Sequence, residues 1–131
     1  MNFIGKKFDE KNEERFNRTW ICKQIRKDLK ESFGKEWKFT VKKTPGSGID
    51  ITIRNGPMSS FNEAVKDANK RGAYFICQNA QYYMTDIDSY KKICEIGEAY
   101  NYDDSNGMVD YFDRNYYLHI YIEMKNGMRG E

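Results

Sequence analysis

The sequence predicts a single α+β domain with an antiparallel sheet of three to four strands and about three helices. The length of 131 residues matches one domain with one hydrophobic core. Segments with apolar residues at helical spacing are interspersed with segments in which apolar and polar residues alternate. Since no linker or repeat divides the chain, we expect one domain over residues 1–131 in the order α-β-β-α-(β)-α-β, with frayed ends at residues 1–10 and 125–131.

The first helix is expected from about Glu13 to Phe33. Its apolar residues recur mostly every four positions, and Gly34 follows as a C-terminal stop. These apolar residues are Ile21, Cys22, Ile25, Leu29 and Phe33. A β-hairpin is expected next, because apolar and polar residues alternate over residues 37–42 and 49–54 on either side of a Pro-Gly-Ser-Gly turn.

The second half of the chain predicts two more helices and a long final strand. A capping box at residues 60–63 precedes a helix that stops at Gly72, and a second box at residues 85–88 precedes another helix. Residues 74–77 are interpreted as a short strand. The last strand is indicated by Leu118, Ile120, Ile122 and Met124, which alternate with polar or aromatic residues.

Composition indicates a soluble cytoplasmic protein without a membrane partner. Hydrophobic residues make up 39% and charged residues 32% of the chain, and no apolar run approaches the ~20 residues of a membrane span. The N-terminus lacks the apolar stretch of a signal peptide. Cys22, Cys77 and Cys94 lie far apart with one histidine, His119, so neither a disulfide framework nor a zinc site is supported.

A local basic surface is the strongest signal for nucleic-acid binding. The net charge is only +2, from 22 bases and 20 acids, so the molecule as a whole has no strong positive field. One face of the first helix carries the candidate nucleic-acid-binding residues Arg18, Lys23, Arg26, Lys27 and Lys30, which Lys35, Lys38, Lys42 and Lys43 can extend. Asp28, Glu31 and Glu36 dilute this surface, and an ordinary solvated face is the alternative.

No motif indicates catalysis, a cofactor or a metal. Gly46 and Gly48 lie in the hairpin turn and not in a phosphate-binding loop, and His119 has no paired nucleophile. Residues 102–113 match a calcium loop at several positions, but Tyr102 stands where the first acid belongs and Asp113 replaces the final glutamate. We therefore expect a polar turn, no catalytic residues and a protein that is not an enzyme.

Tyrosines are concentrated in the C-terminal half, where they provide candidate contacts for a partner. Tyrosine offers a large amphipathic contact area with little side-chain entropy to lose. The candidates are Tyr82, Tyr83, Tyr111, Tyr116, Tyr117 and Tyr121, of which we expect roughly half to lie in the core.

Three segments together resemble a known family. They are TWICKQIRKDLKESFGKEWKFTVKK (19–43), GIDITIRNGP (48–57) and NYDDSNGMVDYFDRNYYLHIYI (101–122). They resemble the large polyvalent protein associated domain, twenty-ninth class, of phages, plasmids and integrated elements. Residues 34–36 stand where that family has a proline-containing turn, and residues 73–90 form a longer segment than its norm. The resemblance implies an α+β fold and a mobile-element origin, but no catalytic residues.

These observations lead to two functional hypotheses. The first is a non-enzymatic binding protein of a phage or mobile element in the cytoplasm of a bacterial host. It would inhibit a host defence complex, of the anti-restriction or anti-CRISPR type, by steric occlusion of a host protein or nucleoprotein complex. The alternative is a nucleic-acid-binding accessory module that uses the basic face of the first helix. An enzyme is the third option, sequestration of a small nucleotide is a further one, and the oligomeric state is left open.

Overall fold

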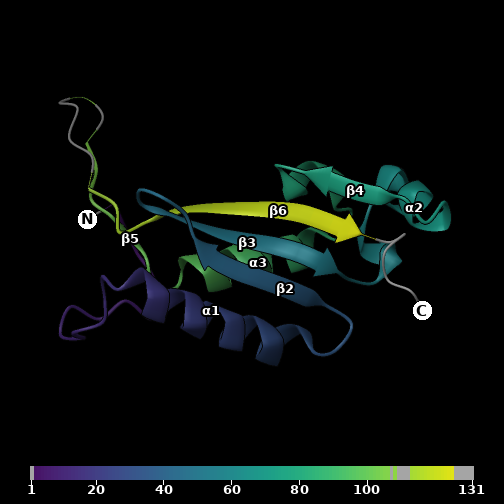
Figure 1. Ribbon diagram of the computed structural model, residues 1–131. Helices are drawn as coiled ribbons and strands as arrows, with labels where there is room; N and C mark the ends of the chain where they lie inside the picture. Colours follow the sequence, from purple (N-terminus) through teal and green to yellow (C-terminus); the bar gives the residue numbers. More distant parts are fainter. Residues whose placement is uncertain (1, 107, 109–112, 126–131) are drawn as a thin grey trace.

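Helices α1 and α3 lie together on one side of a four-stranded sheet, and α2 lies beside β4 at the end of the sheet (Figure 1). The computed structural model describes residues 2–106, 108 and 113–125. The helices and strands in chain order are β1 (Phe3–Ile4), α1 (Arg18–Phe33), β2 (Lys38–Lys43), β3 (Gly48–Asn55), α2 (Glu63–Lys70), β4 (Tyr74–Cys77), α3 (Ile87–Glu98), β5 (Tyr102–Asp103) and β6 (Tyr117–Lys125), with 3₁₀ turns η1 (Met58–Ser60) and η2 (Ala80–Tyr83). The predicted α+β class and the order of the seven predicted elements are confirmed. The strands β1 and β5, which pair in a second, two-stranded sheet, are not predicted, and β1 lies within residues 1–10, which are expected to fray.

The main sheet has the strand order β2-β3-β6-β4, so β2 and β4 are its edges. β2 pairs with β3, and β4 with β6, in antiparallel fashion, whereas β3 and β6 run parallel from the pair Gly48 and Tyr117 to the pair Ile53 and Ile122. The sheet is therefore mixed and not wholly antiparallel. A parallel pair requires a long crossover, and the chain between β3 and β6 provides one that contains α2, β4 and α3.

Helix α1 begins about five residues later than the sequence indicates. The Asn17 side chain accepts hydrogen bonds from the backbone nitrogens of Thr19 (3.1 Å) and Trp20 (3.3 Å), which caps the helix at that point. The helix ends at Gly34, whose positive φ of 71° allows its N–H to bond to the carbonyl of Lys30. The predicted stop is therefore confirmed, and the predicted start is corrected by the cap.

The other two helices are also capped by residues other than those expected. Asn62 caps α2 by accepting from the nitrogens of Ala64 and Val65, while Ser60 lies in η1. Asp86 caps α3 by accepting from the nitrogen of Ser89, at 3.0 Å. In each case the predicted helix exists, but an asparagine or aspartate near the predicted serine or threonine makes the cap.

The core fills the space between α1, α3 and the sheet. Ile21, Ile25 and Leu29 of α1 are fully buried, as are the three isoleucines of β3. β3 is central, and its residues Ile49, Ile51 and Ile53 point to the side of the helices. The N-terminal segment also packs on α3, because the Gly5 nitrogen donates to the Asn101 carbonyl at 2.8 Å and a Cβ at Gly5 would lie 2.3 Å from the Glu98 carbonyl oxygen.

None of the helices in the described residues is both long enough and apolar enough to span a membrane. The expected frayed end beyond Lys125 lies outside the described residues.

Candidate binding surfaces

Helix α1 separates its charges onto two flanks. At 3.6 residues per turn, Lys23, Arg26, Lys27 and Lys30 follow one another around one side of α1, with Lys27 opposite the buried apolar stripe; Asp28 and Glu31 lie on the other side, where Glu31 is the neighbour of Lys27. We call the first four residues the basic flank. Asp28 is engaged away from this flank, because its Oδ2 accepts from the Lys7 ammonium at 2.9 Å and from the Tyr100 hydroxyl at 2.6 Å. Asp28 therefore reduces the positive charge of the basic flank less than the sequence alone suggests.

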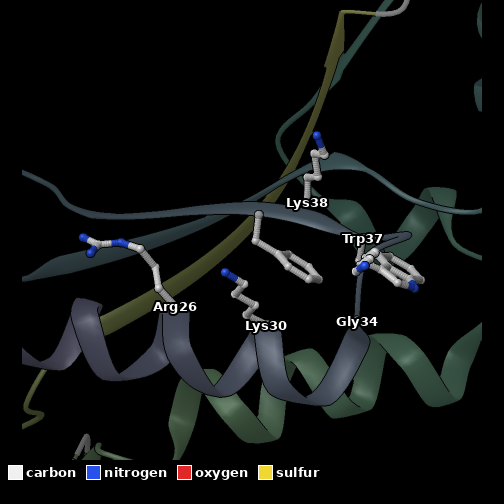
Figure 2. A pocket seen from close by; sticks show the side chains of 7 residues that line it. Arg26, Lys30, Gly34, Trp37 and Lys38 are labelled. Atoms are coloured by element: carbon white, nitrogen blue, oxygen red, sulfur yellow. The ribbon is translucent and has the colours of Figure 1, made fainter.

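A groove of about 710 Å³ lies between α1 and the edge strand β2 (Figure 2). Its lining residues are Arg26, Lys30, Gly34, Lys35, Trp37, Lys38 and Phe39. Four of these seven residues are cationic, and none is acidic. Figure 2 shows Arg26 and Lys30 rising from α1 toward β2, while Lys38 extends from the strand on the side away from the helix. The groove therefore has a positive wall on α1 and a further cation above the strand.

The basic residues of the groove are held to different degrees. Arg26 Nε donates to the main-chain oxygen of Val41 at 3.2 Å, which joins α1 to the edge of the sheet and orients the guanidinium. Within the described part of the chain, neither Lys30 nor Lys35 has an ion-pair partner, and both side chains are exposed. Their ammonium groups are therefore available to an anionic ligand.

Aromatic rings form the β2 side of the groove. The rings of Trp37 and Phe39 are almost parallel, at 3° with centroids 5.8 Å apart, and Phe33 contacts both at 5.1 and 5.3 Å. Trp37 also contacts the fully buried Phe61 at 5.7 Å. Because Trp37 and Phe39 are only partly buried, they belong to the core and to the groove at once.

Arg18, a candidate for nucleic-acid binding, has a structural contact instead. Its Nη1 donates to the carbonyl oxygens of Thr44 (2.8 Å) and Gly48 (2.9 Å), and the side chain is partly buried. These bonds hold the β2–β3 turn against the first turn of α1. Arg18 is not among the residues that line the groove.

The predicted tyrosine contacts do not form one surface. Tyr116 is fully buried and donates its hydroxyl proton to the Gly97 carbonyl at 2.6 Å, so it belongs to the core. Tyr83 is partly buried against Phe75, and Tyr111 lies outside the described residues. Tyr82 and Tyr117 are exposed, at 75% and 43%, and Tyr121 is partly buried.

The two exposed tyrosines lie at opposite ends of the sheet. Tyr117 pairs with Gly48 at the start of β3, whereas the carbonyl of Tyr82 accepts from Asn62, which follows the end of β3. The eight residues of β3 span about 23 Å at ~3.3 Å per residue. A single partner contact that includes both side chains would have to cover this whole length.

The face of the sheet opposite α1 and α3 carries ion pairs of mixed charge. Arg54 of β3 pairs with Glu123 of β6 at 2.8 Å, and His119 Nδ1 lies 3.3 Å from Asp50 Oδ1. The rings of His119 and Tyr121 stack with centroids 6.1 Å apart. The charges of Arg54 and Glu123 neutralise one another here, in contrast to the groove beside α1.

The remaining reactive groups are committed to the fold. Burial raises the pKa of the Cys22, Cys77 and Cys94 thiols, which disfavours the reactive thiolate. In the turn that resembles a calcium loop, Asp103 accepts from the Ser105 nitrogen at 2.9 Å, and Asp113 accepts from the Tyr102 hydroxyl at 2.7 Å. Over residues 2–106, 108 and 113–125, no three His, Cys, Asp or Glu side chains are grouped to hold a metal ion.

Comparison with known proteins adds no relative, since no family model, curated protein or solved structure matches this chain. The resemblance of the three segments to the polyvalent protein associated domain therefore stays a prediction.

Proposed function

We propose that the chain is a non-enzymatic nucleic-acid-binding module and that the groove between α1 and β2 is its contact surface. The observation that carries the proposal is the composition of this groove, in which Arg26, Lys30, Lys35 and Lys38 lie with two aromatic rings and without an acid. Phosphates supply the main attraction of nucleic acid for a protein, and lysine and arginine provide it. The rings add a surface on which bases can stack.

The basic flank extends the positive region beyond the groove. Lys23 and Lys27 are exposed and lie on the same side of α1 as Arg26 and Lys30. A ligand in the groove can therefore meet further cations as it passes along the helix. With a net charge of only +2, we expect weak and strongly salt-dependent binding, in the micromolar range of non-specific complexes.

The test is a salt titration of binding to labelled oligonucleotides of mixed sequence. Replacing Lys27 and Lys30 with Gln should weaken binding and reduce the slope of log K against log salt by about 0.7 to 0.9 for each phosphate that is no longer neutralised. The matched control replaces Lys6 and Lys70 with Gln, because both are exposed, neither lines the groove, and the change in net charge is the same.

An equal reduction of affinity in the Lys6 and Lys70 control would show that only net charge matters and would contradict the site. Absence of any binding at about 50 mM salt would contradict the function itself, because the attraction of cations for phosphates is strongest at low salt.

A second candidate is the occlusion of a host protein, as expected for a phage or mobile-element inhibitor of a defence complex. It is favoured by two exposed side chains on the edge strand β4, Tyr74 at 50% and Ile76 at 62%. They alternate along the strand and so share one face. Tyrosine and isoleucine side chains exposed together are suited to a protein interface.

Capture of a host protein from bacterial lysate, with and without nuclease, separates the two candidates. A protein complex should survive nuclease treatment and the Lys27 and Lys30 changes, but should disappear when Tyr74 and Ile76 are replaced with Ser. Nucleic-acid binding predicts the opposite dependence. Melting curves of each variant distinguish weaker binding from unfolding.

A further inference from the structure

The groove between α1 and β2 has two facing rows of different chemistry. The chain leaves α1, turns through residues 34–37 and returns along β2 in the opposite direction, so the helix and the strand lie side by side (Figure 2). Arg26 and Lys30 lie on the helix, whereas Phe39 lies on β2 and Trp37 lies in the turn directly before it. The hydrogen bond from Arg26 to the Val41 carbonyl fixes the relative position of the two rows.

The cations on the helix side are spaced to match the phosphates of one nucleic-acid strand. Arg26 and Lys30 are four residues apart on α1, which places them about 6 Å apart along the helix axis. Lys35 follows just beyond the helix end and extends the row in the same direction. Neighbouring phosphates of a single strand can therefore contact successive cations on the helix side.

The aromatic row is positioned before any ligand binds. Trp37 is held by Phe33 and Phe61, and a Cβ on Gly56 would lie only 3.0 Å from Cε3 of the indole, so the ring packs closely on that glycine. A partly exposed ring that is already fixed loses little side-chain entropy when a base stacks on it. Stacking of this kind tolerates any base sequence.

We infer that the groove takes single-stranded nucleic acid in preference to duplex, with phosphates along the α1 cations and a base stacked against Trp37; the inference rests on the proposed function. In a duplex the bases are paired and stacked inside, so they cannot reach the rings of a recessed groove while the phosphates contact Arg26 and Lys30. A single-stranded nucleic acid can turn its bases to the β2 side of the groove and its phosphates to the α1 side.

An acidic peptide added along the edge of β2 is the competing occupant. The edge is a less complete template for strand addition, because the Val41 carbonyl already accepts from Arg26. Fixed aromatic rings beside the cations also favour a ligand that carries both phosphates and bases. Polyglutamate therefore serves as a competitor in the test.

The test uses the full chain and anisotropy of labelled oligonucleotides about 12 nucleotides long. We expect the single strand to bind about tenfold or more tightly than the duplex of the same length. An abasic strand with the same phosphates should bind about tenfold more weakly, because it keeps the charge and lacks the stacking. Polyglutamate should compete weakly.

Tryptophan fluorescence gives a direct second measurement, since the chain has only two tryptophans, Trp20 and Trp37. With Trp20→Phe, the remaining Trp37 should be quenched by the single strand and not by the abasic strand. With Trp37→Phe, the remaining Trp20, which packs on Tyr100 outside the groove, should show no quenching. Melting curves confirm that both variants are folded.

The outcomes separate the inference from the proposed function. Equal affinity for single strand and duplex, with binding still weakened in the Lys27 and Lys30 variant, would overturn the inference and keep nucleic-acid binding. An absence of Trp37 quenching by a bound single strand would overturn the inference in the same way. Failure to bind any nucleic acid, or polyglutamate binding as tight as the single strand, would overturn both.

Discussion

Arg18 provides the sharpest distinction between a ligand-binding and a structural role for a basic residue. Its Nη1 donates to two carbonyl oxygens, those of Thr44 and Gly48, so Arg18→Gln removes a charged donor from the β2–β3 turn. A hydrogen bond to a charged group contributes about 1.5–3 kcal/mol, and because one partly exposed nitrogen makes both bonds, we expect a total decrease in stability of about 1.5–2 kcal/mol. An unfolding entropy of about 2.1 cal/mol/K per residue converts this decrease into a fall in Tm of roughly 5–7 °C for this chain.

The measurement is urea and thermal unfolding of Arg18→Gln beside Lys23→Gln. Lys23 is exposed on α1, so its replacement should change the stability by no more than about 0.5 kcal/mol. The affinity of Arg18→Gln for oligonucleotides should stay close to wild type when measured well below its Tm. An unchanged unfolding midpoint together with a reduction of affinity like that of the Lys27 and Lys30 variant would refute the structural assignment of Arg18.

Three further predictions follow from the fold. Leu29→Ala should lower the free energy of unfolding by about 2–5 kcal/mol in urea, because the side chain is fully buried, and an unchanged midpoint would contradict its place in the core. The hydroxyl and backbone nitrogen of Ser89 donate hydrogen bonds to Asp86 and hold the pKa of that carboxyl below its ordinary value. The difference in stability between wild type and Asp86→Asn should therefore be evident at pH 7 and vanish as the pH falls below about 4, and a pH-independent difference would contradict this cause. Calcium should leave Tm unchanged, because Asp103 already accepts hydrogen bonds from Ser105 and Arg114; a saturable rise that disappears in Asp104→Ala would identify a calcium site.

Periodicity along the chain is sufficient to predict the main elements but not their partners. The spacing of Ile21, Ile25 and Leu29 predicts the buried face of α1, and alternation predicts β2, β3 and β6. Alternation assigns side chains to faces and says nothing about which strand lies beside which. The parallel pairing of β3 with β6 depends on the path of the intervening chain, so the sequence pattern does not predict it.

The same alternation contains a signal for Tyr116. Leu118 and Ile120 belong to the inner face by their spacing, and one more step of two residues places Tyr116 on that face, where it is fully buried. Tyr117 then falls on the outer face, where it is exposed. By contrast, no pattern distinguishes Tyr82 from Tyr83, because their positions in η2 depend on tertiary packing.

The groove itself is only partly predictable. Charge identifies the lysines and Arg26, but the alternation of Trp37 and Phe39 with Lys38 and Thr40 assigns both aromatic residues to the core. Phe39 lies on the edge strand β2 and Trp37 directly precedes it, so no further strand continues the sheet beside them and both are partly exposed. Position at an edge is a property of the sheet order, which local sequence does not contain.

The acidic residues of α1 are the main argument against an anion-binding site on this helix, because they offset part of its positive charge. Their positions reduce the weight of this argument. Glu31 follows Lys27 by four residues, so these two side chains are neighbours on α1, whereas a rotation of about 100° around the helix axis separates Glu31 from Lys30 and about 140° separates it from Arg26. Asp28 is already paired with Lys7. Neither acid is among the residues that line the groove, whereas Arg26 and Lys30 are. A chain with almost equal numbers of acids and bases can accordingly present a locally positive groove, whose attraction for phosphate acts over short distances and weakens steeply with salt.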